Sequence, residues 1–236
     1  MTESFDIVGD LPDALADRRA AWTYIRGFAA TWHTPLTPDD GTPEAELAAA
    51  EENLGFRLPA AVREAYALFG RRRAMHSNHD QLLSPAEFYV DDRKEALVFR
   101  HENQGAASWG ILLSDLDQPD PPVRIRPDLA DKDAERWEGW LDSFSVSCIE
   151  IILSESLQAQ DSLCDHGDNE DDDELRRRFT RLPFPAYPAG EEGQNFYAGP
   201  GLLICDGGGD WLSVRAQDEE TLDRFRDDFP ADWLNG

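Results

Sequence analysis

Basic residues are scarce in this sequence. Lys and Arg number 22 against 48 Asp and Glu, which gives a formal net charge of −26 over 236 residues. Such a charge repels the phosphate backbone of DNA or RNA, and attraction to an anionic membrane needs clustered Lys and Arg. We therefore expect no nucleic acid and no membrane as partner, and a basic protein partner instead. A generally acidic proteome would produce the same balance with no partner at all.

Long apolar runs and cysteine frameworks are missing too. No stretch approaches the about 20 apolar residues of a spanning helix, and residues 1–6 show neither the positive start nor the apolar run of a signal peptide. We expect a cytoplasmic protein. Cys148, Cys164 and Cys205 are odd in number and lack CxxC spacing, so neither a disulfide framework nor a zinc site is implied.

The first 70 residues carry helical periodicity. One apolar stripe predicts a helix over residues 15–32, before Pro35 interrupts it. Thr42 and Pro43 favour the start of a second helix that ends at Gly55. A third helix is expected over residues 59–69, with Gly70 as its stop.

The middle of the chain indicates strands. Short apolar runs at 97–99 and 109–113 predict two strands joined around residues 103–105, and residues 123–126 predict a third. From about residue 133 to 160, apolar residues recur at helical spacing, which predicts a long amphipathic helix over this sheet. Helices and strands are segregated along the chain, so the predicted fold class is α+β.

The last third begins with an acidic segment. Residues 161–174 hold eight acids and no Lys or Arg, which predicts a loop or linker. The runs at 202–205 and 211–214 predict a hairpin with a Gly-rich turn that could extend the sheet. The spacing of Leu222, Phe225 and Phe229 predicts a last short helix.

No catalytic motif stands out. His101-Glu102 lacks the second His of a zinc pair, and His76 and His79 lie beside Arg71–Arg73, where positive charge discourages a cation. The acidic segment lacks the residue order of an EF-hand loop. We therefore expect no metal site, no cofactor and no enzymatic activity.

Ordered motif blocks resemble the SUKH superfamily, which includes the fungal Smi and Knr cell-wall regulators and many bacterial immunity proteins. Residues 51–59 (EENLGFRLP), followed by a helix closing at Phe69-Gly70, look like its E, LG, LP pattern. Residues 99–104 (FRHENQ) with Trp109-Gly110 look like its strand, polar turn and tryptophan strand. The DPPV sequence from Asp120 and the helix expected from Trp137 to Phe144 then look like its next strand and following helix. The resemblance covers about residues 44–155. Family members often carry Asn-Gly after the third helix, where this chain continues into three arginines.

The resemblance implies a helix-wrapped antiparallel sheet without a catalytic centre. It also implies neutralisation of a polymorphic or contact-dependent toxin by direct binding. The expected organisation is an N-terminal helical extension (1–42), a SUKH-like core (43–160), an acidic and Pro-rich linker (161–200) and a C-terminal hairpin and helix packed on the core (201–236). The alternatives are a regulatory scaffold like the fungal members and a hydrolase using carboxylates such as Glu102 or Asp210.

Two surfaces are predicted to bind the partner. The first is the strand turn with Glu102, Asn103, Gln104 and Trp109; the alternative is that Asn103 and Gln104 satisfy local backbone groups while Trp109 fills the core. The second is the acidic run, whose alternative is a solvated disordered segment. Its predicted binding residues are Asp168, Glu170, Asp171, Asp172, Asp173 and Glu174.

Overall fold

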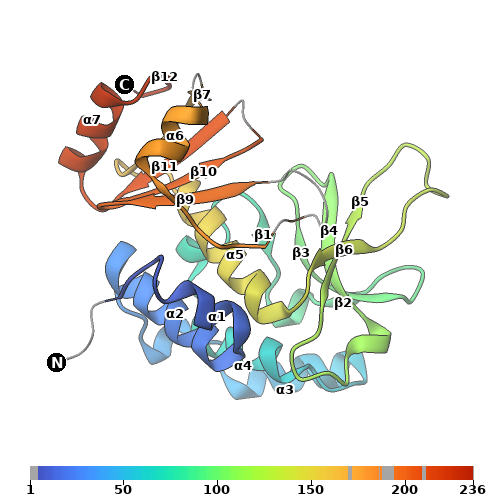
Figure 1. Ribbon diagram of the computed structural model, residues 1–236. Coiled ribbons are helices and arrows are strands. Elements are labelled where there is room, and N and C mark those ends of the chain that lie inside the picture. Colours follow the sequence, from blue (N-terminus) through green and yellow to red (C-terminus); the bar gives the residue numbers. More distant parts are fainter. Residues whose placement is uncertain (1–4, 170–171, 186, 188–193, 209–210, 236) are drawn as a thin grey trace.

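The chain forms an α+β fold with two antiparallel sheets, as the sequence predicts (Figure 1). The structure, a computed structural model, describes residues 5–169, 172–185, 187, 194–208 and 211–235. Short 3-10 turns lie at Pro38–Asp40, Arg73–Met75, Pro85–Glu87 and Leu113–Asp115. None of the helices within these residues is long and apolar enough to cross a membrane.

Two helices replace the single one expected at residues 15–32. Helix α1 spans Leu11–Ala16 and α2 spans Arg18–Trp32. The break falls at Asp17, whose extended backbone leaves the helix while its carboxylate accepts hydrogen bonds from the N–H groups of Arg19 and Ala20. The predicted apolar stripe of α2 is buried.

The next two helices are confirmed, and a buried glutamate fixes the turn between them. Helix α3 spans Glu44–Leu54 and α4 spans Ala60–Phe69. Glu51 is 6% exposed and accepts hydrogen bonds from the Leu58 N–H at 2.9 Å, from Arg63 at 2.7 Å and from Arg57 at 2.9 Å. The E, LG, LP block is therefore a structural unit in which the Glu binds the backbone just before Pro59.

The first sheet contains the predicted strands. Its order is β1-β3-β4-β5-β6, and β2 pairs with β3. The strands are β1 Gln81–Leu82, β2 Tyr89–Val90, β3 Ala96–His101, β4 Ala107–Leu112, β5 Val123–Pro127 and β6 Glu138–Leu141.

The helix expected over 133–160 is wrong in its first third. Helix α5 begins at Phe144 and ends at Leu157, with Ser143 as its N-cap, whose hydroxyl accepts from the Val146 N–H. Residues 138–141 instead pair with β5. Trp137 and Leu141 keep helical spacing with Phe144 by coincidence, because a strand followed by a helix can place apolar residues at the same intervals.

The C-terminal third forms a second sheet of its own. Its order is β12-β7-β11-β10-β9-β8. The strands are β7 Cys164–Asn169, β8 Thr180–Arg181, β9 Asn195–Gly199, β10 Leu202–Asp206, β11 Trp211–Ala216 and β12 Ala231–Trp233, with α6 Asp172–Arg178 and α7 Glu219–Asp228 between strands in the sequence.

Two expectations about this region are corrected. The predicted hairpin exists as β10 and β11, but it does not extend the first sheet. Residues 164–169, expected in a linker, form β7 beside β11. The physical reason is charge compensation from distant residues, because Asp165 is fully buried and binds Arg226 of α7 at 2.7 Å, while Asp161 binds Arg215 at 3.0 Å.

Helix α5 lies between the two sheets (Figure 1). Its residues are buried except for Ser154, and they share one apolar core with α2, α4, the first sheet and the inner face of the second. The outer face of the second sheet forms a separate cluster with α7, including Leu212, Val214 and Phe225. Both sheets are thereby fixed against one central helix.

We expect Glu51→Ala to lower the free energy of unfolding by about 2–3 kcal/mol, because it leaves the buried Leu58 N–H without its acceptor and removes one of the two carboxylates that bind Arg63, the other being Glu44. Denaturant unfolding measures the loss. Glu52→Ala is the matched control, since Glu52 is exposed on the same helix and its removal should change stability by less than about 0.5 kcal/mol. Equal effects of the two substitutions would contradict this role of Glu51.

Candidate binding cleft between the two sheets

A cavity of about 300 Å³ lies where the two sheets and α5 meet. The first sheet contributes Arg100 and Trp109, α5 contributes Glu150 and Glu155, and the second sheet contributes Trp211 and further residues. We call this cavity the cleft. Its remaining lining residues are His79, Asp80, Glu102, Trp140, Ser154, Leu157, Gln158, Gln194, Cys205, Gly207 and Ser213.

A buried arginine organises the wall of the cleft. Arg100 is 2% exposed, and its guanidinium binds Asp80 at 2.9 Å, Glu150 at 3.0 Å and Glu155 at 3.2 Å. The same guanidinium lies 4.4 Å from the centre of the Trp109 ring, in a cation–π contact. Three carboxylates therefore share one cation, which leaves a surplus of negative charge in this wall when all of them are ionised.

Burial changes the pKa of two of these carboxylates, Glu150 and Asp80. Burial raises the pKa of Glu150 above its ordinary value. The Arg100 charge opposes this shift, and repulsion from Glu155 and Asp80 adds to it. Burial likewise raises the pKa of Asp80, with the Arg100 charge opposing the shift. Both groups consequently hold their protons to a higher pH in the folded protein than in the unfolded chain.

Glu155 also fixes the loop before β1. One carboxylate oxygen accepts hydrogen bonds from the N–H groups of Asn78 at 2.6 Å and His79 at 2.7 Å, and the other accepts from the Asp80 N–H at 3.0 Å. Three consecutive amides thus point at one buried carboxylate. This arrangement sets the positions from which the His79 and Asp80 side chains extend.

The predicted turn residues divide between local roles and the cleft. The Glu102 carboxylate accepts from the N–H groups of Gln104 and Ala106, both at 2.8 Å, and the Asn103 N–H donates to Asp80 at 3.2 Å. Trp109 is 5% exposed and belongs to the core. Glu102 and Trp109 nevertheless line the cleft, whereas Asn103 and Gln104 do not.

Among the described residues of the acidic run, Asp168 is the neighbour of a cleft-lining residue. Asp168 is exposed on β7 and pairs directly with Trp211 of β11, so the two side chains lie on the same face of the sheet, the face that carries Trp211 into the cleft. Asp172 begins α6. Glu170 and Asp171 lie outside the described residues.

The remaining acids of the run, Asp173 and Glu174, form local ion pairs. Asp173 lies 3.8 Å from Arg176, and Glu174 lies 2.6 Å from Arg177, all within α6. Neither acid lines the cleft. Whether these residues bind a partner stays a prediction.

Sequence reasoning missed most of the charged wall. His79 was set aside because of Arg71–Arg73, yet Arg71 pairs with Glu46 and Arg72 with Asp40, so two of these charges are compensated. The available signal was different: Arg100 ends an apolar strand run, and Glu150 and Glu155 interrupt an apolar helix. Charges placed inside apolar runs are buried, and buried charges need partners.

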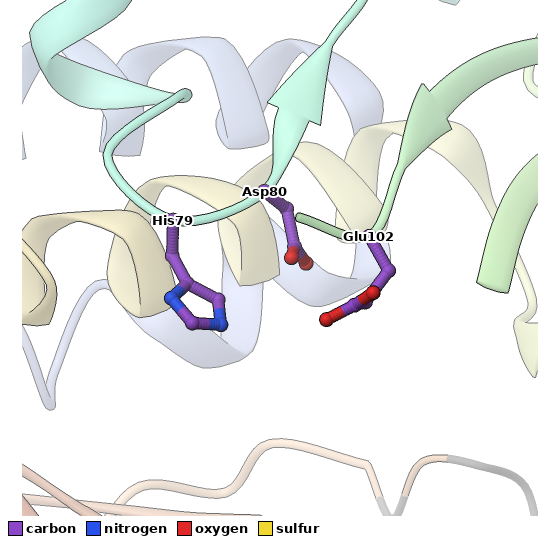
Figure 2. A group of neighbouring side chains, drawn as sticks. All are labelled: His79, Asp80 and Glu102. Atoms are coloured by element: carbon purple, nitrogen blue, oxygen red, sulfur yellow. The ribbon is translucent and has the colours of Figure 1, made fainter. Parts of the chain in front are cut away.

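One group of side chains at the cleft could hold a cation. The donor atoms of His79, Asp80 and Glu102 all lie within 4.8 Å of one another. Figure 2 shows His79 and Asp80 extending from the loop before β1 and Glu102 from the end of β3, with the three side chains directed into the same space. Among the described residues, no second group of this kind is found.

Comparison with known proteins finds no matching family model, no matching curated protein and no matching solved structure.

We expect Arg100→Met to lower the free energy of unfolding by about 3–5 kcal/mol at neutral pH, because it leaves buried carboxylates unpaired. The loss should be smaller at about pH 5 than at about pH 7.5. Without the guanidinium, which opposes the shift, the pKa values of Asp80 and Glu150 in the folded state rise further above those in the unfolded chain. The native state then binds more protons, and stability falls as pH rises through that window. Denaturant unfolding at the two pH values measures this.

The double variant Arg100→Met/Glu150→Gln is the internal control. It removes one of the unpaired charges, so it should recover part of the stability that Arg100→Met loses, and its pH dependence should be weaker. A double variant as unstable as the single one, with the same pH dependence, would show that packing of the Arg100 side chain, and not its charge, holds the wall.

Proposed function

We propose that this chain is a non-enzymatic, SUKH-like binding protein of the bacterial immunity class. It neutralises a polymorphic or contact-dependent toxin in the cytoplasm by binding a basic toxin domain directly. The observation that carries the proposal is the cleft. Among the described residues that line it, the acids are Asp80, Glu102, Glu150 and Glu155, and the one Arg or Lys is Arg100. The concave surface between the sheets therefore has the charge that attracts a basic partner.

The geometry of the cleft favours protein recognition. Both sheets pack on α5, so the walls are rigid and little ordering is required on binding. Trp211 is 38% exposed at the cleft and offers an aromatic contact surface. Its cross-strand partner Asp168 belongs to the predicted acidic run and is exposed, and Glu102 of the predicted strand turn lines the cleft.

The motif blocks support the SUKH assignment through their structural roles. Glu51 fixes the turn between α3 and α4. The FRHENQ block supplies Arg100 and Glu102, and the tryptophan strand supplies Trp109, which lies under the Arg100 guanidinium. The FRHENQ block and the tryptophan strand therefore meet at the charged wall of the cleft, whereas the E, LG, LP block lies in the turn between α3 and α4.

A carboxylate hydrolase is the second candidate. The raised pKa values of Asp80 and Glu150 in a concave site favour it, because a general acid must hold its proton near neutral pH. Against it, Arg100 binds both carboxylates, and Glu150 is 2% exposed, so a substrate has little access to this group. Asp210 lies outside the described residues. Protein binding is therefore the better-supported function.

The direct test is co-expression with a toxin domain encoded beside the gene. We expect growth rescue and a complex that survives size-exclusion chromatography. The charge reversal Asp168→Lys should slow association by roughly an order of magnitude at low salt, with a smaller effect at high salt, because a charge at the edge of the binding surface acts mainly on the association rate. Surface plasmon resonance at two salt concentrations measures this.

Glu219→Lys is the matched control. Glu219 is exposed at the start of α7, a helix that packs on the opposite face of the second sheet, and its reversal changes the net charge by the same two units. It should leave the association rate nearly unchanged. Equal slowing by both substitutions would assign the attraction to overall charge, and absence of any complex with the neighbouring toxin would reject the proposed function.

A further inference from the structure

The three side chains in Figure 2 form a donor set that the proposed protein binding does not require. His79 supplies an imidazole nitrogen, and Asp80 and Glu102 supply carboxylate oxygens, with all donor atoms within 4.8 Å. His79 is exposed at the opening, Asp80 is buried and Glu102 is half-buried. One imidazole and two carboxylates are a ligand combination typical of zinc and related divalent ions.

The charge balance of the cleft calls for a cation at this point. Asp80, Glu150 and Glu155 already outnumber the Arg100 guanidinium that binds them, and Glu102 adds a further acid. Charges in a low-dielectric wall interact strongly, so a set with more carboxylates than cations destabilises the folded protein. A divalent ion beside Asp80 and Glu102 would offset the surplus without any rearrangement of the buried Arg100 pairs.

The surrounding hydrogen bonds hold the candidate ligands in place. Glu155 fixes the backbone of His79 and Asp80. Arg100 binds one oxygen of Asp80 at 2.9 Å, while the other accepts only a 3.2 Å hydrogen bond from the Asn103 N–H. Orientation of metal ligands by such outer contacts is a general property of metal sites.

Two buried donors lie in the wall of the same cleft. The Trp109 indole N–H and the Arg100 Nε–H have no hydrogen-bond partner among the described residues, although both side chains are at least nine-tenths buried. An unsatisfied buried donor costs about 1–3 kcal/mol. Each of these N–H groups has almost no accessible surface, so the wall of the cleft carries this cost whether or not the cleft is occupied.

We propose that His79, Asp80 and Glu102 bind one divalent ion of the zinc and manganese class. Two ligands of a tetrahedral zinc ion lie roughly 3.4 Å apart, given metal–ligand distances of about 2.1 Å. The three donor atoms lie within 4.8 Å of one another, so binding requires them to move closer together. His79 is exposed, and among the described residues its ring hydrogen-bonds to the Asn103 amide and to no buried group. The imidazole disfavours calcium and magnesium, which take oxygen ligands.

Isothermal titration of the chelator-treated, isolated chain tests the site. We expect Zn²⁺ or Mn²⁺ to bind with one-to-one stoichiometry, and Mg²⁺ to bind much more weakly. His79→Ala and Glu102→Gln should each weaken binding at least tenfold, since even outer-contact changes cost 10–100-fold at such sites. NMR should show the His79 ring signals shifting on addition of a diamagnetic ion, Zn²⁺.

Two control variants separate this site from adventitious binding by an acidic protein. His101→Ala removes a histidine of β3 that contacts Ser108, and Glu219→Gln removes an exposed acid of α7. Both should bind the ion like the unmodified chain. No binding to the unmodified chain, or equal weakening in the control and ligand variants, would overturn the proposal. The measurement needs no partner protein, so its outcome is independent of the proposed toxin binding.

Discussion

The structure depends on one buried ion-pair cluster. Arg100 comes from β3, Glu150 and Glu155 from α5, and Asp80 from the loop before β1. The cluster therefore ties the first sheet to the central helix, and the same helix supports the second sheet. Glu155 extends the connection to the backbone of residues 78–80. The shape of the cleft and the placing of its charged groups follow from these contacts.

Stability alone does not account for this cluster. Replacing a buried ion pair by apolar residues of similar volume is often neutral or stabilising, because desolvation offsets much of the attraction between the charges. Here the carboxylates also outnumber the arginine, and burial raises the pKa of both Asp80 and Glu150. A negative surplus beside a cavity is unfavourable for folding and favourable for attracting a cation. That contrast is the physical argument for a binding role of the cleft.

The sequence predicts the local parts of the fold well. Gly55 and Pro59 mark the break between α3 and α4, and the turn residues around Gly105 mark the β3–β4 hairpin. Strand β6 was missed because Trp137 and Leu141 keep the spacing of a helix. Strand β7 was missed because its charge is neutralised by Arg226, about sixty residues away in the sequence. Periodicity reports a local pattern and carries no information about such distant partners.

The same limit applies to the site. Glu102 and Trp109 could be selected from the sequence because they belong to ordered motif blocks, and both line the cleft. Arg100, Glu150 and Glu155 look unremarkable alone, since each is a single charge in an apolar segment. Their role as one ion-pair cluster becomes apparent only when the fold brings β3 and α5 together. The number of acids in a sequence therefore sets the net charge of the protein, whereas the pairing of those acids in the fold determines where a cation can bind. In this chain many acids, such as Asp165, are paired within the fold, whereas in the wall of the cleft three buried carboxylates share the cation Arg100.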